Sequence, residues 1–181
     1  MKKFIKVILL IIAFLFLGYQ FMLSDYNPMF DDEDFVYLRN AIKESKKEDL
    51  QSITTLYTKI SKSIKQRRCI CEQATSFIGP YRHGRSLTKE IYLLKIEKEF
   101  SHTDCLKFIL LNYDYNNKII GIKNAAAFYF NKNVEELNED EQITIVIMLE
   151  NSSLYNPLRN QLGIKRKLDL YKNILSNENS N

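Results

Sequence analysis

Two oppositely charged segments carry side chains suited to acid-base or phosphate chemistry. Four consecutive acids occupy residues 31–34, whereas residues 59–68 carry five basic side chains and no acid. A carboxylate in the first segment can act as a general base, and clustered cations on an amphipathic helix bind phosphate or anionic lipid. Solvated surface is the simpler explanation of both segments. The cations are Lys59, Lys62, Lys65, Arg67 and Arg68.

The three cysteines, Cys69, Cys71 and Cys105, allow thiol or disulfide chemistry. A bridge from Cys69 or Cys71 to Cys105 would leave one thiol unpaired in an oxidising compartment. We favour the simpler interpretation that the cysteines are small buried hydrophobic residues. Neither His83 nor His102 has zinc-ligand spacing relative to the cysteines, so the sequence predicts no metal site.

The elements that must position these side chains belong to one globular domain with a short appendage, as the length of 181 residues indicates. An apolar fraction of 45% with 27% charged residues excludes a disordered chain. Five glycines and three prolines favour helices over a loop-rich fold. The net charge is only +4 and no Arg-rich tract occurs, which argues against nucleic acid as a partner.

An N-terminal segment is apolar enough to cross a membrane. Residues 7–17 carry no polar side chain, and the apolar run reaches Leu23 with Gln20 as its only strongly polar interruption. We predict a cytoplasmic stub and an uncleaved transmembrane anchor over residues 1–24, and a cleaved signal peptide is the alternative. Three lysines before the run predict a cytoplasmic N-terminus and an exported domain after Ser24. These are Lys2, Lys3 and Lys6.

Apolar periodicity predicts helices in the rest of the chain. Apolar residues recur every three or four positions over residues 50–64, and this spacing continues over residues 87–98. A final helix is predicted over residues 165–175, followed by a disordered tail over residues 176–181.

Two capping boxes predict further helix starts. Ser101 with Asp104 and Asn138 with Glu141 have the required spacing. Residues 143–148, after the second box, are ambiguous because their β-branched side chains also suit a buried strand.

From Gly121 onward the residues become specific. Residues 121–132 fit the pattern G-I-x-x-A-A-x-x-Y-F-x-K, residues 137–141 fit L-x-x-x-E, and residues 155–157 read Y-N-P. This half of the chain resembles glycosyltransferase family 51, the peptidoglycan glycosyltransferases. These form the lysozyme-like domain of class A penicillin-binding proteins and of their monofunctional relatives. The resemblance covers residues 67–175 well and residues 28–66 weakly.

The resemblance implies an all-α, lysozyme-like glycosyltransferase domain over residues 25–175 on one N-terminal transmembrane helix. It places the protein in the bacterial inner (plasma) membrane, with the domain on the periplasmic or extracellular side. No resident cofactor is implied with certainty, and Mg²⁺ would accompany the diphosphate of the substrate.

The family's first motif, E-D-x-x-F-x-x-H-x-G, aligns with residues 31–40. Asp32 and Phe35 match and are the implied substrate-binding residues. Asp31 takes the place of the first glutamate, the general base that deprotonates the acceptor sugar. Aspartate is one methylene shorter, and a misplacement of about 1 Å can cost about a hundredfold in rate.

The second motif, G-G-S-T-I-T-Q-Q-L-A-K-N, aligns with residues 67–77. Gln73 is retained as an implied substrate-binding residue, whereas Ser76 replaces the lysine that meets the substrate's diphosphate. Arg67 and Arg68 are candidates to supply that charge from another direction.

In the third motif, R-K-x-x-E, Arg85 matches and is an implied substrate-binding residue. Lys89 occupies the position of the family's second glutamate. Glu90 is the neighbouring catalytic candidate. On a helix this one-residue slip rotates the carboxylate by about 100°, so Glu90 replaces the glutamate only if the helix start is shifted.

Two functions follow from the resemblance. An active enzyme would polymerise lipid II into glycan strands, with a carboxylate as base and basic groups stabilising the departing diphosphate. A catalytically impaired relative would keep the scaffold and its place at membrane lipid, and would bind lipid II, peptidoglycan glycan or a cell-wall synthesis protein. The altered motifs favour the second interpretation.

Overall fold

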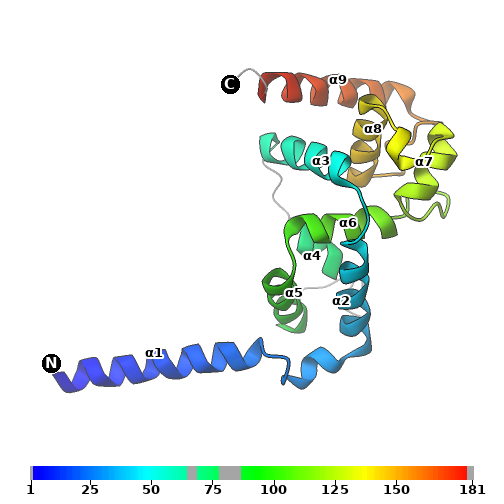
Figure 1. Cartoon of the computed structure of the whole chain (residues 1–181). Coiled ribbons are helices and arrows are strands. Elements are labelled where there is room, and N and C mark those ends of the chain that lie inside the picture. The colour runs from blue at the N-terminus through cyan, green and yellow to red at the C-terminus, as the bar shows by residue number, and fades with distance from the viewer. Residues whose placement is uncertain (1, 65–68, 78–86, 179–181) are drawn as a thin grey trace.

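Helices form the whole framework of the described structure. The computed structural model describes residues 2–64, 69–77 and 87–178 (Figure 1). Within these ranges the strand-like pairing is limited to one isolated bridge between Asp114 and Ile120. The prediction of an all-α fold is confirmed. In chain order the elements are α1 (Lys2–Met22), η1 (Pro28–Asp31), α2 (Glu33–Ser45), α3 (Gln51–Ser63), α4 (Ile70–Thr75), α5 (Leu87–Glu99), α6 (His102–Asn112), α7 (Ile122–Phe130), η3 (Val134–Glu136), α8 (Glu139–Glu150) and α9 (Gln161–Glu178).

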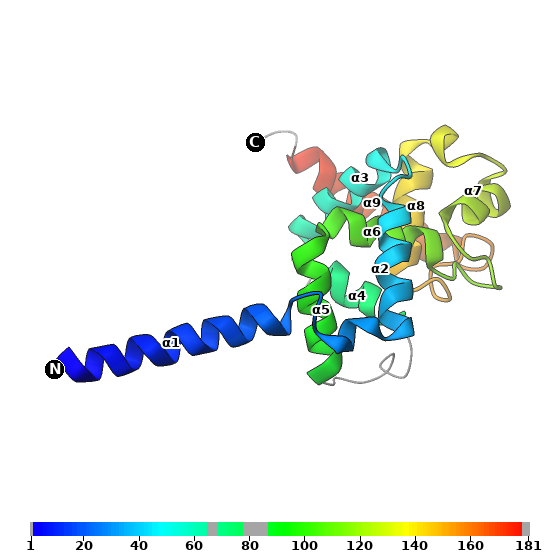
Figure 2. The same cartoon turned by 60° about the horizontal axis from the view of Figure 1, so that its bottom comes forward.

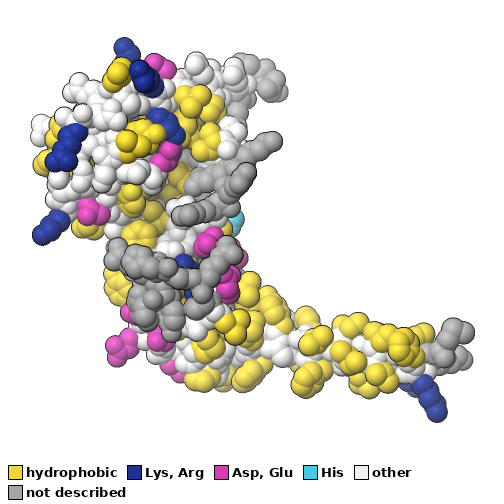
Figure 3. All heavy atoms as spheres, turned by 180° about the vertical axis from the view of Figure 1, so that it is seen from behind, with side chains coloured by type: hydrophobic (Ala, Val, Ile, Leu, Met, Phe, Trp, Pro, Cys, Tyr) yellow, Lys and Arg dark blue, Asp and Glu magenta, His cyan; other side chains and the backbone are white. Residues whose placement is uncertain are grey.

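Helix α1 projects from the globular part as an isolated rod (Figures 1 and 2). Its large apolar side chains are exposed and cover the rod in the space-filling view (Figure 3). The segment Lys3–Met22 is long and apolar enough to cross a membrane, a test that a signal sequence also passes. Helix α1 is therefore a candidate membrane span.

A buried lysine holds the junction between α1 and the domain. The Lys95 side chain on α5 is 4% exposed. Its Nζ donates to the Leu23 backbone oxygen at 3.0 Å and to Asp25 Oδ1 at 2.9 Å. The Glu99 carboxylate lies 3.1 Å from the same Nζ and also pairs with Arg39 of α2 at 2.6 Å. The network ties the end of α1 to α2 and α5.

Helix α6 lies at the centre of the domain. Helices α2, α3, α4 and α7 all pack against it, while α8 packs against both α3 and α9, which also contact each other (Figures 1 and 2). The side chains of Leu106, Phe108 and Leu110 on α6 are buried, as are those of residues 143–148 on α8. Residues 143–148, whose β-branched side chains also suit a strand, are therefore helical. The predicted capping boxes at Ser101 and Asn138 are both formed.

Helix α9 is longer than the sequence predicts. It begins at Gln161 and extends to Glu178, into the segment predicted as a tail. The Asn160 side chain accepts a hydrogen bond from the backbone N–H of Gly163 at 2.9 Å. This cap satisfies a donor in the first turn, so the helix starts before the predicted residue 165.

Cys71 and Cys105 form a disulfide between α4 and α6. Our favoured interpretation, that the cysteines are unpaired hydrophobic residues, is wrong for these two. The packing of α4 on α6 brings together side chains that are 34 residues apart in the sequence. Cys69, which precedes α4, is the cysteine outside the disulfide.

Gly121 has a backbone conformation that other residues rarely adopt. Its φ is +83°, and an added Cβ would lie 2.5 Å from the Leu111 carbonyl oxygen.

We expect Gly121→Ala to lower the free energy of unfolding by about 2 kcal/mol or more, as measured by urea denaturation. The control is Lys118→Gly at φ 62° in the same loop, which relieves strain and should not destabilise. Equal losses in both variants would contradict this account.

The Asp25 carboxylate makes the junction at α1 sensitive to acid. Its hydrogen bond and ion pair with Lys95 hold the pKa of Asp25 below the ordinary value of 3.8. Such a carboxylate stabilises the fold above its unfolded pKa, and the contribution is lost as pH falls through the folded value. We expect Asp25→Asn to lower the urea midpoint at neutral pH and to match wild type well below pH 3.8.

The matched control is Glu135→Gln, an exposed acid on η3. It should change the urea midpoint little at either pH. A difference between Asp25→Asn and wild type that stays constant into strong acid would show that the carboxylate charge does not act at this junction.

Candidate functional site

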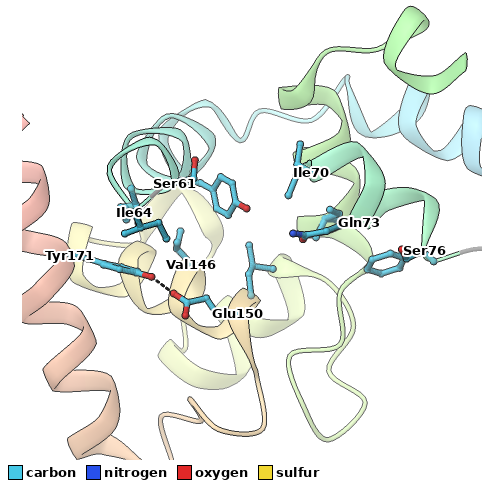
Figure 4. A pocket seen from close by; sticks show the side chains of 13 residues that line it. Ser61, Ile64, Ile70, Gln73, Ser76, Val146, Glu150 and Tyr171 are labelled. Carbon is cyan, nitrogen blue, oxygen red and sulfur yellow. Dashed lines mark hydrogen bonds between the residues drawn. The ribbon is translucent and has the colours of Figure 1, made fainter. Parts of the chain in front are cut away.

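A groove of about 480 Å³ opens between helices α3, α4, α6, α8 and α9 (Figure 4). This volume lies within the range of small-molecule sites. Gln73 and Ser76 of α4 lie at one end of the groove, and Glu150 and Tyr171 lie at the other. The rest of the lining is mainly apolar and includes Ile60, Ile64, Ile70, Ile109, Val146 and Leu149.

Helix α4 brings one predicted substrate-binding residue into this groove. Gln73 lines it from the middle of the helix, and Ser76, at the position of the family's diphosphate lysine, lines it from the C-cap. The disulfide from Cys71 to α6 fixes the position of this short helix. The groove therefore coincides with part of the second motif.

The positions of the diphosphate lysine and the second glutamate meet, but they carry a neutral serine and a lysine. Lys89 on α5 donates a hydrogen bond to Ser76 Oγ on α4, with 3.0 Å between Nζ and Oγ. The cation that the resemblance expects on α4 thus comes from α5. Glu90 follows on the same helix and is exposed, whereas Lys89 is half-buried against α4. The carboxylate of Glu90 is turned away by the rotation that one residue imposes.

The acidic segment has one exposed candidate and two residues with structural roles. Asp31 ends η1 and is exposed. Asp32 caps α2, because its Oδ1 accepts hydrogen bonds from two backbone N–H groups of the first turn. Phe35 is fully buried, with its ring centroid 4.9 Å from that of Phe30 and 4.7 Å from that of Tyr92 on α5. These contacts hold η1 and Asp31 against α5.

The remaining predicted residues are basic. Arg67, Arg68 and Arg85 lie outside the described residues. Of the predicted basic face, Lys59 and Lys62 are described, and both are exposed on α3. The roles of these side chains at a membrane or a diphosphate stay predictions.

The sequence analysis missed the polar end of the groove formed by α8 and α9. Tyr171 donates a hydrogen bond to Glu150, and Lys167 Nζ lies 2.5 Å from the other carboxylate oxygen of Glu150. Burial and the Glu150 carboxylate raise the pKa of Tyr171 well above 10.0, so this hydroxyl stays a donor. Two features of the sequence could have indicated this end of the groove. Glu150 directly follows the apolar run that ends at Leu149, and Lys167 and Tyr171 are four residues apart, which places them on one face of a helix.

The matched family motifs in the C-terminal half mostly support the scaffold. Lys132 Nζ pairs with both carboxylate oxygens of Glu141, at 2.8 and 2.9 Å. Tyr129 donates to the Tyr115 backbone oxygen at 2.8 Å and accepts from Asn156 at 3.4 Å. These bonds connect α7 to α8 and to the loop before α9.

The described residues contain a possible ligand set for a soft metal. The Sγ atoms of Cys69 and Cys71 and a ring nitrogen of His102 all lie within 4.8 Å of one another. The sequence spacing predicted no metal site, and that stays a prediction, but α4 and α6 bring these residues together. Sulfur and imidazole suit zinc rather than Mg²⁺, which prefers oxygen ligands. Mg²⁺ stays a prediction, with the diphosphate of the substrate as its ligand.

Comparison with known proteins gives a family match. The model of the family described as Transglycosylase matches residues 52–176. Penicillin-binding protein 4 of Bacillus subtilis (strain 168) is 33% identical over 76 residues, which cover 42% of this chain and 12% of that protein. Penicillin-binding protein 1B of Escherichia coli (strain K12) is 38% identical over 60 residues, 33% of this chain and 7% of that protein. Penicillin-binding protein 2a of Streptococcus pneumoniae is 34% identical over 71 residues, which cover 39% of this chain and 10% of that protein. The chain thus matches only a small part of each of these relatives.

The disulfide holds α4, and with it Gln73 and Ser76, at the groove. Removing it with Cys71→Ala and Cys105→Ala together should lower the free energy of unfolding by about 3–4 kcal/mol, because it closes a loop with a separation of 34 residues. Denaturant unfolding under non-reducing conditions measures the effect. Cys69→Ala is the control, since this cysteine lies outside the disulfide. A double variant as stable as the control would contradict the expectation.

Proposed function

This chain belongs to the transglycosylase family, and we propose that it is a membrane-anchored relative that binds lipid II or its glycan product without polymerising it. Four features support the proposal: the charge at the meeting point of α4 and α5, the adjacent groove, the apolar helix α1 and the retained scaffold bonds. The charge at the meeting point of α4 and α5 gives the strongest support.

The charge at Lys89 argues against turnover. Polymerisation requires a base at the acceptor hydroxyl and groups that stabilise charge in the transition state. A cation stands where the resemblance expects the second glutamate, and it is hydrogen-bonded to Ser76. Glu90 is exposed on a neighbouring face of α5. The site therefore lacks a carboxylate at this position.

The same arrangement favours binding of an anion. A lysine ammonium and a serine hydroxyl can both donate hydrogen bonds to diphosphate oxygens, and lysine is a common phosphate ligand. Ser76 lines the groove, so an anion held by Lys89 and Ser76 would lie at one of its polar ends. The apolar lining and the second polar end can then accept the rest of an amphipathic substrate.

The position of the domain also supports a lipid-linked ligand. Helix α1 is a candidate span, and the Lys95 network fixes the domain to its end. Each cation of the predicted basic face would add about 1 kcal/mol of attraction near an anionic surface. A ligand carried by membrane lipid would then be present at the membrane to which the domain is attached.

An active transglycosylase is the second candidate, and one observation favours it. Asp31 is exposed at the end of η1, which the buried rings of Phe30, Phe35 and Tyr92 hold against α5. A carboxylate near the first-glutamate position is therefore available to an acceptor hydroxyl.

A polymerisation assay with lipid II and the detergent-solubilised full chain separates the two candidates. We expect activity to be absent or at least about a hundredfold below that of an intact family member. Rapid glycan synthesis by the wild type, lost in Asp31→Ala, would overturn the proposal in favour of an active enzyme. Activity gained by combining Asp31→Glu, Ser76→Lys and Lys89→Glu would support a site that has lost turnover.

Binding of fluorescent lipid II tests the other half of the proposal. We expect Lys89→Met to weaken binding about tenfold, because it removes a charge-assisted hydrogen bond to the diphosphate. Lys98→Met removes an exposed cation from the same helix and should bind as wild type does. Equal affinity of both variants, or no binding by the wild type, would contradict a diphosphate site at Lys89.

A further inference from the structure

Four residues with metal-binding side chains meet where α4 packs against α6. Cys69 precedes α4, and Cys71 lies in its first turn. His102 and Cys105 are three residues apart on α6 and so share a face of that helix. The two helices thus contribute a C-x-C pair and an H-x-x-C pair. Neither the family match nor the proposed function uses this cluster.

The separations within the cluster suit a tetrahedral metal site. Cys69 Sγ lies 3.6 Å from His102 Nε2, and the Sγ atoms of Cys69 and Cys71 and the imidazole lie within 4.8 Å of one another. Ligand atoms around tetrahedral zinc are about 3.5–3.8 Å apart. Cys105 Sγ is bonded to Cys71 Sγ and stands next to this group of three rather than within it. After reduction, the Cys71 and Cys105 sulfurs would have to separate by side-chain rotation for all four residues to surround one ion.

We propose that, when the Cys71–Cys105 disulfide is reduced, Cys69, Cys71, Cys105 and His102 bind one Zn²⁺ ion. The disulfide and the metal site are alternative states of the same cluster. Three thiolates and one imidazole form a recognised zinc ligand set. The site is available before the disulfide forms, or after a dithiol has reduced it.

Formation of the metal site requires reduction of the disulfide and then exchange of protons for the metal. A dithiol transfers two electrons and two protons to the Cys71–Cys105 disulfide, and it becomes a disulfide itself. Zn²⁺ then replaces the protons of the three thiols, so three protons are released. His102 contributes a ring-nitrogen lone pair as the neutral imidazole and releases no proton.

The four side chains differ in their exposure to solvent, and this difference indicates the side from which an ion would approach. Cys71 and Cys105 are fully buried, Cys69 is half-buried and His102 is exposed. An ion or a small dithiol would therefore approach from the side of Cys69 and His102. On that side Cys69 Sγ also donates to Glu97 Oε1 at 2.9 Å, a bond that the arriving metal would replace.

Cobalt provides a spectroscopic test on the full chain in detergent. The protein is reduced with a dithiol, the reductant is removed under anaerobic conditions, and Co²⁺ is added. We expect one Co²⁺ per chain with the visible absorption of a tetrahedral thiolate site, displaced by Zn²⁺. The oxidised protein should bind neither ion in this way. A reduced protein that takes up neither Co²⁺ nor Zn²⁺ would overturn the proposal.

Variants outside the disulfide identify the ligands. We expect Cys69→Ser and His102→Ala each to weaken Zn²⁺ binding by more than about tenfold. Both can still form the oxidised disulfide, so circular dichroism of the oxidised forms checks their fold. Thr103→Ala, an exposed neighbour of His102, should bind as wild type does. Wild-type affinity in both ligand variants would mean that the metal is bound elsewhere.

Discussion

The structure depends on the burial of one ammonium group. An unpaired buried charge costs several kcal/mol, so Lys95 must be surrounded by acceptors. These acceptors come from Leu23 and Asp25 after α1 and from Glu99 on α5, while the ring of Phe30 lies 5.1 Å from Nζ. Because they come from separate segments, satisfying Lys95 brings the end of the anchor, η1 and α5 together. The acidic segment is thereby held close to the end of α1.

Local signals in the sequence predicted most of the fold. Capping boxes at Ser101 and Asn138 act within one turn, so they identified the starts of α6 and α8 without tertiary information. Residues 143–148 were ambiguous because α8 is buried on all sides, and a helix without a polar face loses its periodic signal. The predicted start of α9, residue 165, is too late, because the side chain of Asn160 caps a helix that begins at Gln161.

The candidate site was predictable only where it coincides with family motifs. Gln73 was identified from its motif position, and the meeting of Ser76 with Lys89 follows from two aligned motifs. Glu150 and Tyr171 carry no motif, and they reach the groove because α8 and α9 pack beside α3. The proximity of His102 to Cys69 was missed for the same reason, since the two residues are 33 positions apart in the sequence. Contacts of this kind depend on packing, which periodicity does not specify.

Helix α4 links the cysteine cluster to the groove. It has six residues, so its ends are about 9 Å apart. Cys69 and Cys71 lie at its N-terminal end, and Gln73 and Ser76 lie toward its C-terminal end. A helix this short moves as one unit, and a covalent bond to α6 now fixes its first turn. Cys71 and Cys105 are ligands in the proposed metal site as well, so either state ties the first turn of α4 to α6. The proposed metal site would therefore keep Gln73 and Ser76 at the groove, as the disulfide does.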